Sequence, residues 1–477
     1  MQPENDAESS EGRKRNRGNQ MGTVGNAFRK LYRLAIASLV TSIGLMAQTI
    51  HAQDFEHDPI NYASAPADNP ITRLQSRIDS GEAQLSYEPR TGYLKSLLAA
   101  LDVPISSQML VYSKTSLQRH RIAPKTPRAI YFNDDVYVGF CLFGDVLEVS
   151  AVDPNLGTVF YSMDQSAAEK PFLQRQNDSC LTCHASSNTR GVPGHLVRSV
   201  YSDRNGYPVL SMGTYRVDQT TQVEKRWGGW YVTGTHGEQK HLGNLIVSGN
   251  SQREPIDNAD GQNVTRLEKY FDATNYLSPH SDLVALMVLE HQTEAHNQLT
   301  RANFQTREAL FAETRMNKEL GEPEGHRWES TNTRIKSVCE SLVRYLLFSE
   351  ETQLTARLQG TTDFASDFAK RGPRDPEGRS LRDFDLEKRL FKYPCSYLIY
   401  SRSFDELPTE AKERVLHRMW EVLSGKDNSK EFAHLRPEDR QSILEIIRAT
   451  KPGLPENWYD DQAAAVNSSA TSDVAER

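Results

Sequence analysis

Short runs of β-branched and aromatic residues follow one another in the middle of the chain, separated by turn-forming residues such as Asn-Asp, Gly-Asp and Asp-Pro-Asn-Leu-Gly. Runs of this length with tight turns between them are typical of antiparallel strands. The pattern predicts a β-rich region over residues 128–260. The strand-like runs are residues 129–142, 146–154 and 157–164 and, after a polar interruption, 195–203, 207–218 and 226–237.

Apolar residues spaced by three and four predict helices on both sides of this region. A linker and a short helical lead-in occupy residues 53–127, and an all-helical region is expected over 261–458. Together with the middle region this indicates an α+β fold. The predicted helices are residues 71–85 and 92–104 in the lead-in, and 265–277, 281–320, 333–348, 407–425 and 436–451 in the helical region.

The N-terminal 52 residues have the architecture of a leader with a secretory signal peptide. Arg29, Lys30 and Arg33 precede an apolar segment at 34–47, which is shorter than a membrane-spanning helix, and cleavage is expected after Ala52. An uncleaved anchor is the alternative. We therefore expect an exported protein, in the periplasm or cell-wall space, without a membrane span after cleavage. The Ala/Ser/Asp-rich tail at 459–477 is expected to be disordered.

Composition and charge narrow the class of protein. Hydrophobic residues make up 37% and charged residues 25% of the 477 positions, and the formal net charge is −7, without a basic stripe. These values argue against a nucleic-acid partner. Three of the five cysteines, Cys141, Cys339 and Cys395, lie far apart in the sequence. Isolated cysteines of odd number do not predict a disulfide framework. A single Cys339–Cys395 bridge and two free thiols both remain open.

The remaining two cysteines belong to the run Cys180-Leu-Thr-Cys183-His184. Two thiols on one helical turn can reach the two vinyl groups of a porphyrin edge, and the following imidazole can ligate the iron. A zinc site would need two further soft ligands, and a thioredoxin-type dithiol favours a βαβ frame. The motif therefore predicts one covalent haem c. A different metal, a dithiol and a chance occurrence are the alternatives.

The same residues resemble the c-type cytochromes. The run CHASSNTRGVPGHL is similar to the Cys-His…Gly…Pro…Leu segment of small soluble members. The resemblance implies thioether bonds at Cys180 and Cys183, His184 as the proximal iron ligand, and the Pro193 carbonyl as acceptor for the proximal imidazole. It ends near Leu196, and both flanks here are strand-like where those cytochromes are helical. The chain also resembles large exported single-haem bacterial proteins of unassigned function.

The sequence identifies the sixth iron ligand less clearly than the proximal ligand. His236 ranks first, because it lies in a Gly-rich loop after aromatic residues that could line a flat macrocycle. Met212 is the runner-up, followed by His241 and His195. An open coordination position is the remaining alternative.

The predicted helix 281–320 carries polar residues on the line of its apolar stripe, including Glu290, His291, Glu294 and Arg301. They predict either one wall of a polar cavity or a helix that turns from buried to solvated along its length. The leading functional hypothesis is an exported mono-haem cytochrome that transfers single electrons between redox protein partners, within a larger complex or alone. The alternatives are a haem oxidoreductase acting on a small molecule, and a haem-based sensor or scaffold.

Overall fold

A computed structural model describes residues 54–248 and 257–459 of the chain. The described residues from Phe55 onward belong to the second of the two units into which the chain divides, Phe55–Arg477. The predicted leader at 1–52 lies outside the described residues, as do residues 460–477 of the predicted tail. The lead-in, the β-rich region and the helical region all fall within the second unit.

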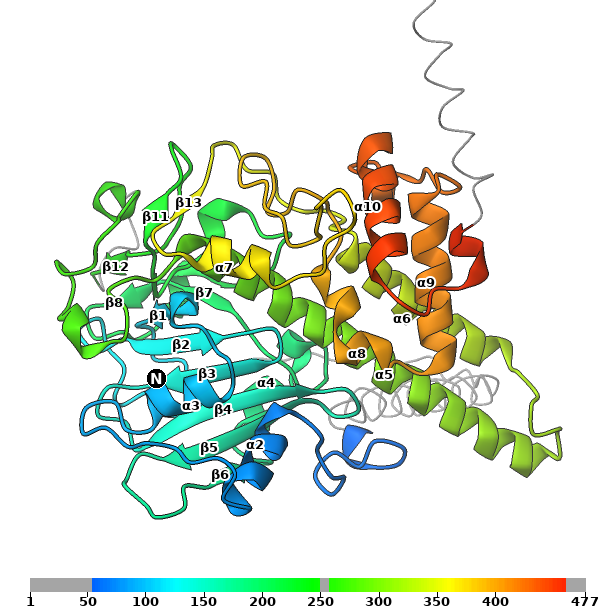
Figure 1. Cartoon of the computed structure of the whole chain (residues 1–477), viewed down its shortest axis with the longest axis horizontal. Coiled ribbons are helices and arrows are strands. Elements are labelled where there is room, and N and C mark those ends of the chain that lie inside the picture. The colour runs from blue at the N-terminus through cyan, green and yellow to red at the C-terminus, as the bar shows by residue number, and fades with distance from the viewer. Residues whose placement is uncertain (1–53, 249–256, 460–477) are drawn as a thin grey trace, which may run out of the picture. The chain divides into compact units, whose positions relative to one another are not determined.

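This unit contains a seven-stranded sheet in the order β10-β1-β2-β3-β4-β5-β6, which lies on the left in Figure 1. All neighbouring strands are antiparallel, and β2 to β5 form the predicted meander. The strands of the sheet are β1 (Met109–Val111), β2 (Arg128–Phe132), β3 (Val136–Phe140), β4 (Val146–Asp153), β5 (Gly157–Asp164), β6 (Leu173–Arg175) and β10 (Trp230–Tyr231).

Three pairs of short strands lie outside this sheet. In two of these pairs the strands are antiparallel, and in the third they are parallel. The pairs are β7 (Arg198–Val200) with β9 (Thr214–Arg216), β8 (Ser202–Asp203) with β12 (Ile246–Val247), and β11 (Gly234–Thr235) with β13 (Gln359–Gly360).

The two faces of the large sheet are covered by different parts of the chain. One face, which includes Val138 and Val149, packs in one apolar cluster with α2 (Pro70–Asp79) and α3 (Leu94–Ala100). The opposite face contributes Tyr137 and other residues to a second cluster built around the long helix α5. Alternating side chains on the strands therefore separate two cores.

The helical region is organised around α5 (Leu283–Leu320), which begins at the N-cap Asp282. Every residue from Leu283 to Thr300 is buried, so this half of the helix is enclosed on all sides. Helix α6 packs on α5, α9 on α6 and α10 on α9. The other helices of the second unit are α4 (Leu181–His184), α6 (Glu329–Leu346), α7 (Phe364–Lys370), α8 (Arg402–Asp405), α9 (Thr409–Leu423) and α10 (Pro437–Thr450).

These elements confirm the α+β fold class, with a β-rich middle followed by helices, and differ from the prediction in two segments. The predicted helix at 265–277 is a series of turns with only a short 3-10 helix, Ala273–Asn275. Leu267, Phe271 and Tyr276 are instead buried in the cluster that contains the sheet residue Tyr231. The strand-like runs at 195–237 form only two- and three-residue strands. Tertiary packing overrides the local pattern in the first segment.

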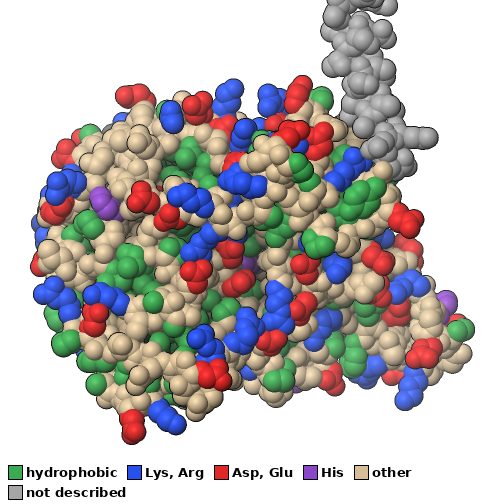
Figure 2. All heavy atoms as spheres, in the orientation of Figure 1, with side chains coloured by type: hydrophobic (Ala, Val, Ile, Leu, Met, Phe, Trp, Pro, Cys, Tyr) green, Lys and Arg blue, Asp and Glu red, His purple; other side chains and the backbone are tan. Residues whose placement is uncertain are grey.

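The surface carries charges of both signs. Figure 2 shows Lys and Arg side chains interspersed with Asp and Glu over the face in view. None of the helices in the described ranges is long and apolar enough to cross a membrane.

Candidate functional site

The Cys-X-X-Cys-His residues form one isolated helical turn. Cys180 has helical backbone angles, and its carbonyl oxygen accepts from the backbone N–H of Cys183 at 3.2 Å and of His184 at 3.0 Å. Leu181 is buried and anchors the turn, whereas Cys183 is exposed and Cys180 is partly buried. Both thiols are free. The turn therefore holds Leu181 inward and leaves the thiols of Cys180 and Cys183 unpaired on the same helical turn.

The imidazole of His184 has a defined orientation. Its Nδ1 lies 2.9 Å from the carbonyl oxygen of Gly194, and its ring packs on Phe160 of β5 at a centroid distance of 4.8 Å. A carbonyl oxygen only accepts, so Nδ1 carries the proton and Nε2 holds a lone pair. Burial lowers the pKa of His184, which keeps the ring neutral. Nε2 has no hydrogen bond to a described residue, which is the state that ligates a metal.

The acceptor for this imidazole is one residue later than predicted. The carbonyl of Pro193 accepts from the backbone N–H of Thr158 at 3.1 Å, and Gly194 takes the place beside the ring. A Cβ atom on Gly194 would lie 2.1 Å from Oδ1 of Asn297 on α5. Only a glycine permits this close approach of the loop to the helix.

Asn297 connects the loop to α5 through two hydrogen bonds. Its Oδ1 accepts from the backbone N–H of His195 at 3.0 Å, and its Nδ2 donates to the carbonyl of His195 at 2.9 Å. The residues that follow the motif are therefore tied to the buried part of the central helix.

A second connection between the motif and α5 is ionic. Glu294, which is 3% exposed, accepts from Arg190 at 2.7 Å and from Arg216 of β9 at 2.8 Å. Arg216 also pairs with Asp218 at 3.1 Å. Arg301 lies one turn beyond Asn297 on α5. Burial lowers the pKa of the Arg301 guanidinium, and the nearby charge of Arg190 lowers it further. Three arginines and two carboxylates therefore lie together beside the motif.

A charged pair lies on the sheet next to the residue that supports His184. Arg128 of β2 reaches across Gly139 of β3 to Glu148 of β4, with 2.5 Å between Nη2 and Oε2. Glu148 is directly opposite Ser162, two residues from Phe160 on the same face of β5. The pair is partly exposed, with 19% and 15% of the two side chains accessible. The sheet near the motif therefore carries a partly exposed ion pair.

The structure brings one of the four predicted distal residues, His195, into the neighbourhood of His184. Its ring lies 6.1 Å from that of Phe160. Both ring nitrogens are hydrogen-bonded to hydroxyl groups, Nε2 to Ser150 at 2.8 Å and Nδ1 to Thr158 at 3.2 Å. The ring of His195 is therefore fully engaged inside the protein.

The other three lie apart from the motif. His236 and His241 contact each other at 4.6 Å in loops beyond β10, at the sheet edge far from β5. Backbone N–H groups of Asn263 and Gly243 donate to His236 Nε2 at 2.9 Å and to His241 Nδ1 at 3.0 Å. Met212 ends a short 3-10 helix and is partly exposed. Among the described residues, none of the three has a hydrogen bond or ring contact with His184, Gly194 or Phe160.

The polar residues in the first half of α5 are buried, and Glu290 and His291 are paired inside the protein. Glu290 and Arg226 form an ion pair at 2.8 Å with side-chain exposures of 0% and 2%. His291 is bonded through Nδ1 to Gln219 at 2.6 Å and through Nε2 to Ser396 at 2.7 Å. The first half of the helix is buried on all sides, and exposed positions occur in its second half, as expected for a helix that turns from buried to solvated along its length.

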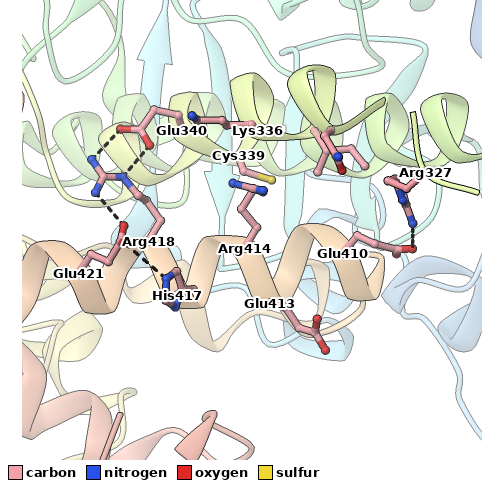
Figure 3. A pocket seen from close by; sticks show the side chains of 12 residues that line it. Arg327, Lys336, Cys339, Glu340, Glu410, Glu413, Arg414, His417, Arg418 and Glu421 are labelled. Atoms are coloured by element: carbon pink, nitrogen blue, oxygen red, sulfur yellow. Dashed lines mark hydrogen bonds and ion pairs between the residues drawn. The ribbon is translucent and has the colours of Figure 1, made fainter. Parts of the chain in front are cut away.

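A groove of about 920 Å³ lies between α6 and α9, away from the motif. In Figure 3, Arg418 of α9 bridges Glu340 of α6 and Glu421. Cys339 lies at the same groove and is 1% exposed. Cys339 and Cys395 are both free thiols. The groove contains none of the predicted site residues.

In the ranges that the structure describes, no group of three or more His, Cys, Asp and Glu residues is arranged to hold a metal ion. No family model matches the chain, and neither the curated proteins nor the solved structures include a match.

Proposed function

We propose that the chain binds one haem c through Cys180 and Cys183, with Nε2 of His184 as the proximal iron ligand, and transfers single electrons between redox partners. The observation that carries the proposal is the orientation of His184. Its Nδ1 is bonded to Gly194 and its Nε2 is free, next to two free thiols on the same turn. When bound, the haem supplies a one-electron iron couple.

Residues around the motif suit the remaining parts of a haem. Gly194 and Phe160 hold the imidazole plane and keep Nδ1 protonated. Arg190, Arg216 and Arg301 carry positive charges suited to the two propionates, because guanidinium groups recognise carboxylates well. The predicted leader fits the proposal, since covalent attachment takes place after export. We therefore propose a periplasmic or cell-wall location and redox proteins as partners.

The test is covalent haem in the full-length chain, expressed with a cytochrome c maturation system. A denaturing gel stained for haem and a pyridine haemochrome spectrum should show one haem per chain. The double variant C180A/C183A should retain none, whereas the matched double variant C339A/C395A should retain the wild-type amount. Haem-free wild type, or covalent haem in C180A/C183A, would falsify the proposal.

A second candidate function is a haem oxidoreductase with an open distal position. It is favoured by the placement of the four predicted distal residues, because His195 is engaged with two hydroxyl groups and His236, His241 and Met212 lie elsewhere. An absorption spectrum separates the two functions. A carrier should give a low-spin ferrous spectrum that carbon monoxide does not change, whereas an open iron should respond to carbon monoxide and peroxide.

A further inference from the structure

Tyr137 of β3 belongs to a buried chain of hydrogen bonds that the proposed function does not use. Its hydroxyl lies 3.1 Å from Nδ1 of His296 and 2.7 Å from Nε2 of Gln292, both on α5. The Oε1 of Gln292 accepts from the hydroxyl of Tyr397 at 2.5 Å. Tyr137, Gln292 and His296 are all at least 95% buried.

The positions of the protons in this chain follow from its partners. Nε2 of Gln292 also lies 2.8 Å from the backbone carbonyl of Asn133, which only accepts, so the amide orientation is determined. Gln292 therefore donates to the hydroxyl of Tyr137. The single proton of Tyr137 must then point to Nδ1 of His296. Burial lowers the pKa of His296 to about 4, so this ring is neutral and its Nδ1 can accept.

His296 has a second distinctive feature. With Nδ1 as acceptor, the neutral ring carries its own proton on Nε2, and this buried nitrogen has no hydrogen-bond partner among the residues that the structure describes. An unpaired buried donor is costly and rare in native proteins. The imidazole of His296 occupies this site although its Nε2 lacks a partner, which points to a role for Nδ1.

Tyr137 differs from the other buried tyrosines of the described ranges, none of which has a hydrogen bond from its hydroxyl to a histidine ring nitrogen. Tyr131, on the neighbouring strand, donates to Oε1 of Gln108 at 2.7 Å. Most of the others donate to backbone carbonyl oxygens, which are poor proton acceptors. The tyrosines with backbone partners include Tyr62, Tyr93, Tyr112, Tyr231, Tyr276 and Tyr345.

Aromatic rings connect Tyr137 to the proposed haem ligand. The ring of Tyr137 lies 3.9 Å from that of His195, and His195 lies 6.1 Å from Phe160. Phe160 in turn supports His184 at 4.8 Å. Two intervening rings therefore separate the phenol from the imidazole of His184, and Tyr137, His195 and Phe160 are all buried.

We infer that Tyr137 is a redox-active relay residue, which gives up one electron toward the haem through His195 and Phe160 while its phenolic proton moves to Nδ1 of His296. The inference rests on the proposed haem at His184 with the open distal position of the second candidate function, and hydrogen peroxide is the oxidant. Reduction of hydrogen peroxide to two molecules of water consumes two electrons and two protons: Tyr137 supplies one electron, the bound haem would supply the other, and the two protons come from solvent. The O–H bond of Tyr137 breaks and an N–H bond forms on His296, which leaves a neutral phenoxyl radical and an imidazolium.

The experiment uses the ferric full-length haem protein, mixed with hydrogen peroxide and frozen within milliseconds to seconds for electron paramagnetic resonance. Wild type should give a tyrosyl radical signal. Y137F should lose at least about nine-tenths of that signal, and Y131F, a buried tyrosine bonded to glutamine, should keep it. The absorption spectra of the three ferric proteins should be identical, which shows that each variant folds and holds its haem.

A second variant tests the proton acceptor. H296Q keeps a polar side chain but removes the basic nitrogen, so radical formation should slow at least tenfold while the ferric spectrum is unchanged. Wild type without covalent haem would overturn the proposed function and the relay with it. Covalent haem with no tyrosyl signal, an undiminished signal in Y137F, or a spectrum that peroxide does not change would overturn the relay alone.

Discussion

His184 and Gly194 are joined by two hydrogen bonds. The imidazole Nδ1 of His184 lies 2.9 Å from the carbonyl oxygen of Gly194, and the backbone N–H of Gly194 donates to the carbonyl of His184 at 2.8 Å. The pair closes the ten-residue loop that follows the Cys-X-X-Cys-His turn. It sets the direction of Nε2, on which the proposed haem ligation depends.

Replacement of Gly194 by alanine should destabilise the protein and disturb this loop. The new Cβ would lie 2.1 Å from Oδ1 of Asn297, and overpacking at a buried site costs about 1–3 kcal/mol. Urea unfolding measures the loss, and haem staining measures attachment. Gly325→Ala is the control, because a Cβ there has no atom within 4 Å. Equal unfolding free energies of the two variants would contradict the role given to Gly194.

Replacement of Arg226 by glutamine should be strongly destabilising. Glu290, its partner at 2.8 Å, is fully buried and would lose its compensating charge, which typically costs about 3–5 kcal/mol. Arg266→Gln is the matched control, since Arg266 pairs with Glu268 on the surface, where ion pairs contribute about 0–1 kcal/mol. Denaturant unfolding should separate the two variants by several kcal/mol, and similar losses would show that the burial of the pair is unimportant.

The buried His291 should make stability fall as the pH falls. Burial lowers its pKa from 6.5 to about 3. Between these values the unfolded chain binds a proton that the folded protein does not, so the free energy of unfolding decreases with decreasing pH, by up to about 1.4 kcal/mol per pH unit.

Unfolding of wild type and His291→Gln between pH 7 and pH 4 measures this contribution. The variant should show the shallower dependence on pH, whatever its stability at pH 7. His417→Gln, at an exposed site on α9, should follow the wild-type profile. A wild-type slope no steeper than that of His291→Gln would refute the assignment.

Glu294→Gln should raise the reduction potential of the proposed haem. The substitution removes the negative charge between Arg190 and Arg216, and added positive charge near an iron favours its reduced state. The expected increase is on the order of tens of millivolts, from the Coulomb energy of one charge at an effective dielectric constant near 20.

A spectroscopic redox titration measures the shift. Glu313→Gln is the control, because Glu313 lies on the same helix about 28 Å further along its axis at 1.5 Å per residue. An unchanged or lowered potential in Glu294→Gln would be inconsistent with a haem beside this cluster.

Spacing along the chain was sufficient to predict several local features. The meander from β2 to β5 and helices such as α5 and α9 match their predicted runs closely, because alternation and three-to-four periodicity act over a few residues. The Cys180–His184 turn was recognisable for the same reason. The prediction of a helix at 265–277 was wrong, because the apolar residues of this segment pack on the sheet and that packing outweighs a weak helical pattern.

Contacts between distant segments decided the surroundings of the motif. Tyr137 meets His296 across 159 positions, and Asn297 meets His195 across 102, through the register of the sheet and the placement of α5. No rule of sequence spacing predicts such pairs. A difference of one residue, from Pro193 to Gly194, changes which carbonyl accepts the hydrogen bond from His184. Local spacing thus determines the elements and the Cys-X-X-Cys-His motif, whereas the nonlocal burial of apolar surface determines which polar side chains meet.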